Sequence, residues 1–310
     1  MTLERTKRPL DFIVSRFSRL FPTYWAAILI TTLVVHVGGL TDQQIPLRAV
    51  LENAPMIQAG ILNVPMVDGC YWTLAVELCF YGLMLALFLM KRLGNIEPLL
   101  FGWIACKWLW AAHVGTHQLS WIVGVALGQQ WAPFFTIGVV AYRLFTRSTS
   151  WVQAATLLLF AIVTEFCLDG AEMGVVAVLV TAVFLLFVSG YATALRWRVF
   201  TWLGSISYPL YVLHENVGRT VIRAIERHGF GESIAVPVAI VNALVLATIV
   251  SYLVERPARD WIRGWYRGHS RRLPAPSGGV PIPPSLGAGK PARTVLERSC
   301  IRAAARSGMR

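Results

Sequence analysis

Hydroxyl and carboxyl side chains recur at helical spacing in the apolar stretch "CYWTLAVELCFY", from Cys70 to Tyr81. Thr73, Glu77 and Tyr81 are four residues apart and share one face of a helix. A carboxylate in such a stretch needs a hydrogen-bonding or cationic partner. The pattern predicts either a structural pair that holds two helices together or a polar wall of a substrate cavity. Trp72 belongs to that wall or serves as an aromatic anchor at a membrane interface.

A second polar face runs along "LGSISYPLYVLHENVG". Ser207, Tyr211 and His214 follow at i, i+4 and i+7, so they form one stripe on an apolar helix. Pro209 lacks a backbone N–H and should bend the helix, which frees the carbonyl near Ser205. His214 is either a structural histidine with satisfied hydrogen bonds or a group that handles protons or contacts substrate.

Two arginines stand three residues apart in "RFSRLFPTYW", just before the first long apolar stretch. Arg16 and Arg19 are therefore neighbours on a helical turn. Basic residues in this place orient a membrane helix, but lysine would serve that purpose equally well. Guanidinium groups also bind phosphate through two parallel hydrogen bonds. The pair predicts either topogenic charge or a binding site for a phosphorylated donor on the cytoplasmic side.

The last apolar stretch ends in "SYLVERPARDW". Glu255 and Arg256 form either a local ion pair at the interface or a contact with a ligand that arrives from the cytoplasm. Pro257 is expected to end the helix, because proline removes a backbone donor and clashes with the preceding turn.

Other buried groups favour packing over chemistry. Lys107 lies deep within an apolar stretch and needs a carboxylate partner, which either Glu77 or Glu165 could supply. The five cysteines include no Cys-x-x-Cys pair, and no histidine accompanies them at ligand spacing. We therefore expect neither a metal site nor a disulfide framework, and we interpret the thiols as small apolar side chains.

The composition indicates which elements must position these groups. Of 310 residues, 56% are apolar and 14% are charged, against about 25% charged in soluble domains. Crossing a bilayer requires about 20 apolar residues in a helix. The sequence therefore predicts an all-α fold, a polytopic bundle of about eight transmembrane helices. The predicted spans are 21–39, 71–90, 96–113, 124–145, 151–168, 173–191, 201–218 and 234–254, and residues 119–131 form either part of the fourth span or a short interfacial helix.

The net charge of +12 is concentrated at the C-terminus. Twelve Lys and Arg but two acidic residues lie between Arg256 and Arg310, so nucleic-acid binding is not indicated. Residues 1–260 are predicted to form the membrane domain, and residues 261–310 a disordered, basic, Pro- and Gly-rich tail. The positive-inside rule places both termini in the cytoplasm. The opposite face carries three arginines that go against this rule: Arg219, Arg223 and Arg227.

Together these four stretches resemble the acyltransferase-3 family of integral membrane O-acyltransferases. "RFSRLFPTYW" is similar to the family's R-x-x-R loop followed by P-x-Y-W, and "YWTLAVE" to its W-[ST]-L-x-[VI]-E signature. "LGSISYPLYVLH" and "SYLVERP" are similar to its L-G-x-[IV]-S-Y-x-[IL]-Y-x-x-H and S-Y-x-x-E-[KR]-P segments. The four occur in the family's order and cover residues 10–260.

The resemblance implies a ten-helix fold that transfers an acyl group from acyl-CoA to a sugar hydroxyl of a glycan or lipid-linked sugar, as in polysaccharide O-acetylation. It implies that Arg16 and Arg19 hold the phosphates of acyl-CoA, a co-substrate, and that no cofactor is bound permanently. The expected location is the inner (plasma) membrane, with the lipid bilayer as a further partner. On this basis the candidate catalytic residues are Glu77, His214 and Glu255, and the candidate substrate-binding residues are Trp72, Thr73, Tyr81, Ser207 and Tyr211.

The sequence departs from the family pattern at its N-terminus. Family members begin with two further spans, of which the first carries an arginine and a histidine that is taken as the general base, and neither has a counterpart here. We do not transfer that role to His36, which lies in the following span. The chain as written is expected to lack part of the catalytic site, either because its start is assigned too late or because it is an inactive member. A non-catalytic multi-pass protein, such as a transporter, is the alternative function.

Overall fold

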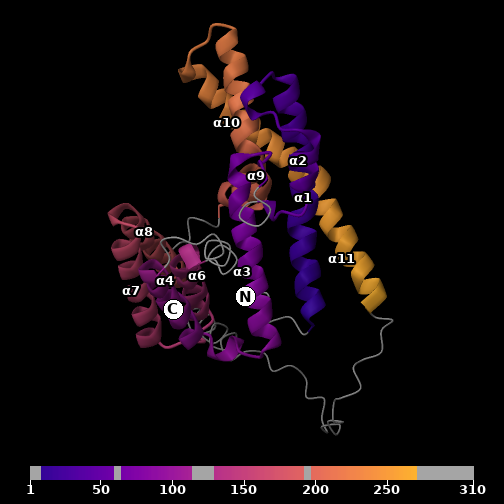
Figure 1. Cartoon of the computed structure of the whole chain (residues 1–310). Helices are drawn as coiled ribbons and strands as arrows, with labels where there is room; N and C mark the ends of the chain where they lie inside the picture. The colour runs from indigo at the N-terminus through magenta and orange to yellow at the C-terminus, as the bar shows by residue number, and fades with distance from the viewer. Residues whose placement is uncertain (1–7, 59–63, 114–128, 192–196, 271–310) are drawn as a thin grey trace, which may run out of the picture. The chain divides into compact units, whose positions relative to one another are not determined.

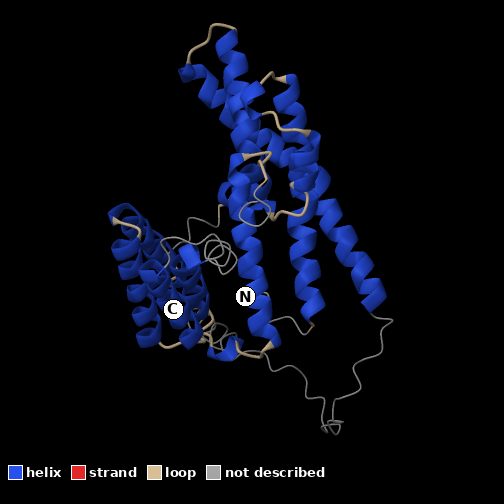
Figure 2. Ribbon diagram, in the orientation of Figure 1, coloured by secondary structure: helices blue, strands red, loops and turns tan. Residues whose placement is uncertain are grey.

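The computed structural model describes residues 8–58, 64–113, 129–191 and 197–270, and these residues form helices joined by turns, without a strand (Figures 1 and 2). The predicted all-α fold is confirmed. The tail from residue 271 lies outside the described residues. The longer helices are α1 (Pro9–Val37), α3 (Trp72–Leu89), α4 (Glu97–His113), α6 (Ala132–Phe145), α7 (Trp151–Leu168), α8 (Ala171–Val188), α9 (Arg198–Arg227), α10 (Glu232–Val250) and α11 (Arg256–Ser270), and the short ones include α2 (Leu47–Glu52) and the 3₁₀ turn η4 (Gly69–Tyr71).

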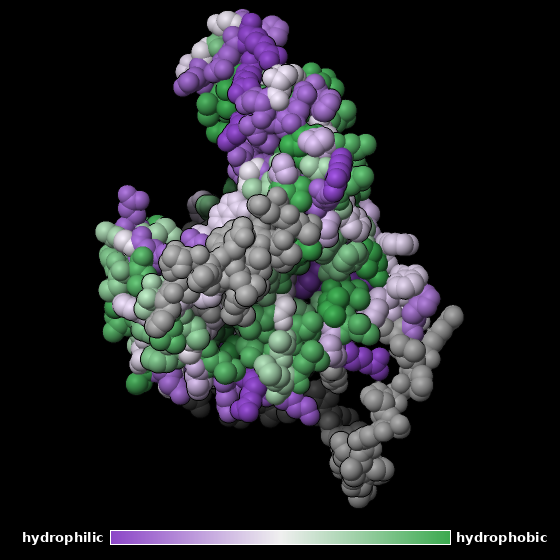
Figure 3. All heavy atoms as spheres, viewed as in Figure 1, coloured by the Kyte–Doolittle hydropathy of each residue, from purple (hydrophilic) through white to green (hydrophobic). Residues whose placement is uncertain are grey.

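Five described helical segments are long and apolar enough to cross a membrane. The chain is therefore a helical membrane bundle, and Figure 3 shows hydrophobic residues over much of its surface, with hydrophilic ones gathered where α9 meets α10. α4 and α6 are shorter, at 17 and 14 residues. α9, which holds the predicted span 201–218, is long enough but is not among the five, so the count of eight spans stays a prediction. Most of residues 119–131 fall outside the described part. The five segments are Pro9–Val37, Gly69–Leu89, Trp151–Leu168, Ala171–Val188 and Glu232–His269.

Two apolar cores hold the helices together, and α3 contributes to both. α4, α6, α7 and α8 pack around one core, which also receives Met84 and Leu87 from α3. α1, α9 and α10 pack around the other, which receives Leu74. Small residues bring α10 close to α9, because its buried alanines recur every four residues along one face. These are Ala235, Ala239, Ala243 and Ala247.

Helix α1 begins well before the predicted span 21–39. Pro9 occupies the first helical position, where its missing N–H costs nothing. Asp11 stands in the first turn, where its negative charge interacts favourably with the positive end of the helix dipole. Arg16 and Arg19 therefore lie inside a helix, as their spacing predicts, and not in a loop as in the family motif that they resemble. Their side chains are fixed relative to the apolar part of the same helix.

The prediction that Pro257 ends the last helix is wrong. A π-helical turn, Ser251–Glu255, joins α10 to α11, and Pro257 is the second residue of α11. A proline in the first turn of a helix is tolerated, because its N–H would lack a regular partner there. The predicted domain boundary at residue 260 falls within α11.

Lys107 of α4 has the buried carboxylate partner that its depth requires. Its Nζ lies 2.8 Å from Glu165 Oε1 on α7 and 2.5 Å from Asp169 Oδ2. Lys107 and Glu165 are 6% and 1% exposed. Of the two partners that the sequence allows, Glu165 and not Glu77 makes the pair.

Replacing Lys107 by methionine should destabilise the protein by about 3–5 kcal/mol, because Glu165 is then a buried charge without its cation. The check is the melting temperature in detergent, with Lys91→Met, an exposed lysine on the turn after α3, as the control. A double change, Lys107→Met with Glu165→Leu, should recover part of the loss. An unchanged melting temperature for Lys107→Met would contradict a stabilising pair.

Candidate active site

An open cavity of about 500 Å³ collects most of the candidate site residues. It lies among α1, α3, α6 and α9, and its lining includes six of the ten residues that the sequence singles out. These six are Arg19, Thr73, Glu77, Tyr81, Ser207 and Tyr211; the others that line it are Leu74, Phe80, Phe135 and Tyr208.

Glu77 is joined to Arg16 through a tyrosine. The Tyr81 hydroxyl donates a short hydrogen bond to Glu77 Oε1, one turn earlier on α3. Arg16 Nη1 donates to the same hydroxyl at 3.3 Å, and its guanidinium lies 4.8 Å from the centre of the Tyr81 ring. The partner that the Glu77 carboxylate requires is therefore Tyr81, whose hydroxyl is polarised by a cation on a different helix.

Thr73 and Tyr211 join α3 to α9 at the other end of the cavity. Tyr211 donates from its hydroxyl to the Cys70 carbonyl at 2.9 Å, and the same hydroxyl lies 2.5 Å from Thr73 Oγ1. Thr73 is two helical turns from Tyr81, or about 12 Å along α3. Glu77 therefore stands midway between an arginine end and a hydroxyl end of one cavity.

Two side-chain contacts in the cavity wall involve residues that the sequence does not single out as candidates. Phe80 of α3 and Phe135 of α6 stack with their ring centres 4.2 Å apart. Tyr208 donates from its hydroxyl to the Leu20 carbonyl at 3.0 Å, which ties α9 to α1. Tyr208 stands inside the quoted segment of α9 and could have been found there, whereas the sequence around Phe135 gives no signal.

The structure does not bring Trp72, His214 or Glu255 to this cavity. Trp72 packs its ring against Trp131, at 5.3 Å. His214 is exposed and its Nδ1 lies 2.8 Å from the Tyr211 carbonyl; it shares the face of Ser207 but lies about 10 Å further along α9.

Glu255 is buried in the π-helical turn. Its Oε2 accepts from Ser251 Oγ at 3.3 Å, and its Oε1 lies 3.9 Å from Arg259. Arg256, the expected partner, instead lies over the Tyr252 ring at 3.8 Å. The Ser205 carbonyl, which Pro209 leaves without its helical donor, accepts from Ser251 Oγ at 3.5 Å.

The three arginines at the far end of α9 serve the fold. Arg223 makes two bonds to the Asp42 carboxylate, at 2.8 and 3.1 Å, and Arg219 binds Glu215 at 2.9 Å. Arg227 donates to the Gly38 carbonyl at 3.1 Å, which caps the end of α1. These contacts give each arginine a structural partner, and the binding of an anionic glycan that the family resemblance suggests for them stays a prediction.

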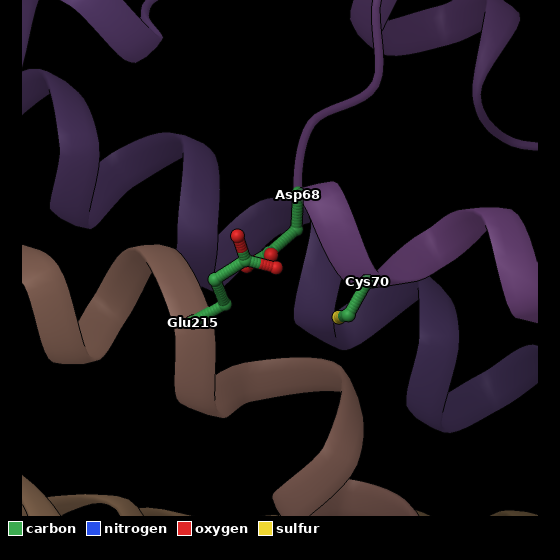
Figure 4. Close-up of side chains that lie close together, drawn as sticks. All are labelled: Asp68, Cys70 and Glu215. Carbon is green, nitrogen blue, oxygen red and sulfur yellow. The ribbon is translucent and has the colours of Figure 1, made fainter. Parts of the chain in front are cut away.

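Asp68, Cys70 and Glu215 form a compact group between η4 and α9 (Figure 4). One ligand-type atom of each lies within 4.8 Å of the others. The backbone N–H of Asn216 donates to Asp68 at 3.1 Å. Burial, with the nearby Glu215 carboxylate as a lesser cause, raises the pKa of Asp68 to about 6. Because one proton can satisfy both carboxylates, we interpret the group as a carboxyl pair, and the absence of a metal site stays a prediction.

The Asp68 carboxyl should make the protein less stable as the pH rises from about 4 to 6. Its folded pKa is above the unfolded value of 3.8, so the folded state binds more protons within that window and stability is lost on deprotonation. Asp68→Asn should remove this loss, which amounts to at most about 3 kcal/mol. The measurement is melting temperature against pH. Equal slopes for the two proteins would contradict the assignment, and Asp260→Asn, at an exposed aspartate, is the control.

The fold and the site define a class: a multi-pass helical membrane protein whose helices line an open cavity that holds a carboxylate. A family model described as an acyltransferase domain, acyltransferase-3, matches residues 2–256. The chain therefore belongs to the acyltransferase-3 family and is a membrane acyltransferase. Searches of curated proteins and of solved structures gave no match.

Proposed function

We propose that this protein transfers an acyl group, with acetyl the expected one, from acyl-CoA to a hydroxyl of a glycan or a lipid-linked sugar. The observation that carries the proposal is the order of groups along the cavity. Arg16 is bonded to Tyr81 at one end, Thr73 and Tyr211 line the other, and Glu77 stands between them on α3. Arg19 is a further arginine of the lining.

The two ends of the cavity suit two different substrates. Guanidinium groups bind phosphates, which places the coenzyme at the Arg16 and Arg19 end. Hydroxyl groups exchange hydrogen bonds with sugars, which places the acceptor near Thr73 and Tyr211. The positive-inside rule puts the arginine end at the cytoplasmic face of the inner membrane, with both termini on that side. Donor and acceptor would then enter from opposite faces and meet at Glu77.

Glu77 is the carboxylate in the cavity lining, and we assign to it the general-base role that the family resemblance gives to a histidine without a counterpart in this sequence. In the proposed reaction it accepts the proton of the acceptor hydroxyl while the oxygen attacks the thioester carbonyl. The carbon–sulfur bond then breaks, the acyl group forms an ester with the acceptor, and the departing thiolate takes up the proton. Holding both substrates in one cavity supplies much of the remaining advantage.

The proposal is tested by comparing the surface glycans of cells with and without the gene. Mass spectrometry should show the loss of one acyl increment (~42 Da for acetyl, from its atomic composition) from a defined sugar when the gene is deleted, with recovery on complementation. Identical acyl content in glycans and lipid-linked sugars of both strains would overturn it.

A further inference from the structure

A row of four arginines runs along one face of α11, beyond the apolar part of α10. Glu232–His269 is one helical segment of 38 residues, about 57 Å long, or nearly twice the thickness of the hydrocarbon core. α11 therefore continues past the bilayer core. The arginines are three or four residues apart and share a face; they are Arg256, Arg259, Arg263 and Arg267.

This face of α11 reaches the first turns of α1 through long side chains, and the two helices run antiparallel. Arg263 donates to Ser18 Oγ at 3.2 Å and to the Ser15 carbonyl at 3.4 Å. Tyr266 donates to Asp11 at 2.7 Å. As the contacts advance along α11 they move back along α1, so α11 runs past the turns of α1 that carry the Arg-x-x-Arg pair. Figure 1 shows the two helices as neighbours.

Positive charge is in excess where the two helices meet. Arg263 is within electrostatic range of three arginines, Arg16, Arg259 and Arg267, and of one carboxylate, Asp260. Its described hydrogen bonds go to uncharged serine oxygens. Six arginines stand on these turns of α1 and α11 against three carboxylates. Like charges held this close repel one another, and an anion with several charges would relieve the repulsion. The carboxylates are Asp11, Glu255 and Asp260.

We infer that Arg259 and Arg263 of α11 bind phosphate together with Arg16 and Arg19 of α1, so that one polyphosphate site spans both helices. The choice of ligand rests on the proposed function: coenzyme A carries a 3′-phosphate in addition to its diphosphate, and two pairs of guanidinium forks match these two groups.

A lipid headgroup offers the same phosphate chemistry at the same depth. Trp261 and Trp265 stand on the opposite face of α11, 72% and 58% exposed, and tryptophan of this kind favours the headgroup level of a bilayer. The experiment must therefore separate a soluble coenzyme from an anionic lipid.

The coenzyme arm uses the full-length protein in phosphatidylcholine nanodiscs, titrated with CoA. Arg259→Gln with Arg263→Gln should weaken CoA binding at least about tenfold, because charged hydrogen bonds are lost, and should weaken 3′-dephospho-CoA less. Arg92→Gln, an exposed arginine on the turn after α3, is the matched control and should bind as the wild type does. Arg263→Lys keeps the charge and loses the fork, so it should give a smaller loss and shows the effect apart from folding.

The lipid arm repeats the melting measurement in nanodiscs with and without phosphatidylglycerol. If the double variant keeps its CoA affinity but loses a stabilisation that phosphatidylglycerol gives the wild type, the phosphate is a lipid's and the coenzyme assignment is overturned. If neither measurement changes, there is no phosphate site on α11. If CoA binding is weakened by Arg16→Gln with Arg19→Gln but not by the double change on α11, the proposed donor site stands without α11. If the wild type binds no CoA, the proposed function fails, while the lipid arm still tests α11.

Discussion

Exchanging Glu77 for glutamine is expected to lower acyl transfer at least about a hundredfold and to leave the yield of folded protein unchanged. Glutamine has the shape of glutamate, and its amide oxygen can still accept the hydrogen bond from Tyr81. It cannot take up the proton of the acceptor hydroxyl. The measurement is transfer of labelled acetyl from acetyl-CoA to membrane glycans, with size-exclusion chromatography of the same preparations as the check on folding.

The control for this change is Glu226→Gln, at an exposed glutamate near the end of α9. It removes one negative charge from the same protein and should leave transfer as it is. A fall in folded protein that matches the fall in activity would show that Glu77 holds α3 and α1 together and does no chemistry. Full activity would remove Glu77 from the reaction altogether.

The second large effect is expected at the arginine pair. Replacing Arg16 and Arg19 together by glutamine should abolish the thermal protection that acyl-CoA gives the protein. A ligand at a hundred times its dissociation constant stabilises a protein by about 2.7 kcal/mol, and this term vanishes when the ligand no longer binds. Arg16 also holds Tyr81, so part of the intrinsic stability should be lost as well. The measurement is the melting temperature with and without acyl-CoA.

A matched pair of exposed arginines, Arg92 and Arg198, provides the control. Their replacement by glutamine removes the same charge without touching the cavity, so acyl-CoA protection should remain. Unchanged protection in the Arg16 and Arg19 variant would remove the donor assignment. A lower melting temperature with normal protection would leave Arg16 as a structural partner of Tyr81.

Spacing within one helix predicts a large part of the site. Thr73, Glu77 and Tyr81 share a face because they are four residues apart, and all three line the cavity. The same reasoning places Ser207 and Tyr211 together. Spacing does not show how far along a helix the cavity extends. His214 lies on the same face as Ser207 and Tyr211, but beyond the end of the cavity.

Contacts between distant segments could not be obtained in the same way. Thr73 and Tyr211 are 138 residues apart, and nothing in either motif names the other. Phe135 lines the cavity from α6, but a phenylalanine in an apolar helix looks the same whether it faces lipid, core or ligand. The cluster of Asp68 and Glu215 depends on how η4 meets α9, which no local pattern states.

The course of the last helix shows why a local rule can fail. Proline removes one of the regular backbone hydrogen bonds of an α-helix. If the helix before Pro257 were regularly α-helical, it would be expected to end there. The wider turn Ser251–Glu255 changes this hydrogen-bonding pattern before the proline is reached.

That wider turn also sets the direction in which α11 presents its arginines. A π-helical turn accommodates one more residue than an α-helical turn, and one residue corresponds to about 100° of rotation. With ordinary winding, the guanidinium row of α11 would be turned by about that angle away from its contacts with Ser15 and Ser18 of α1. One additional residue in the helical turn, and not the arginines alone, therefore determines whether this row of arginines faces α1 or points away from it.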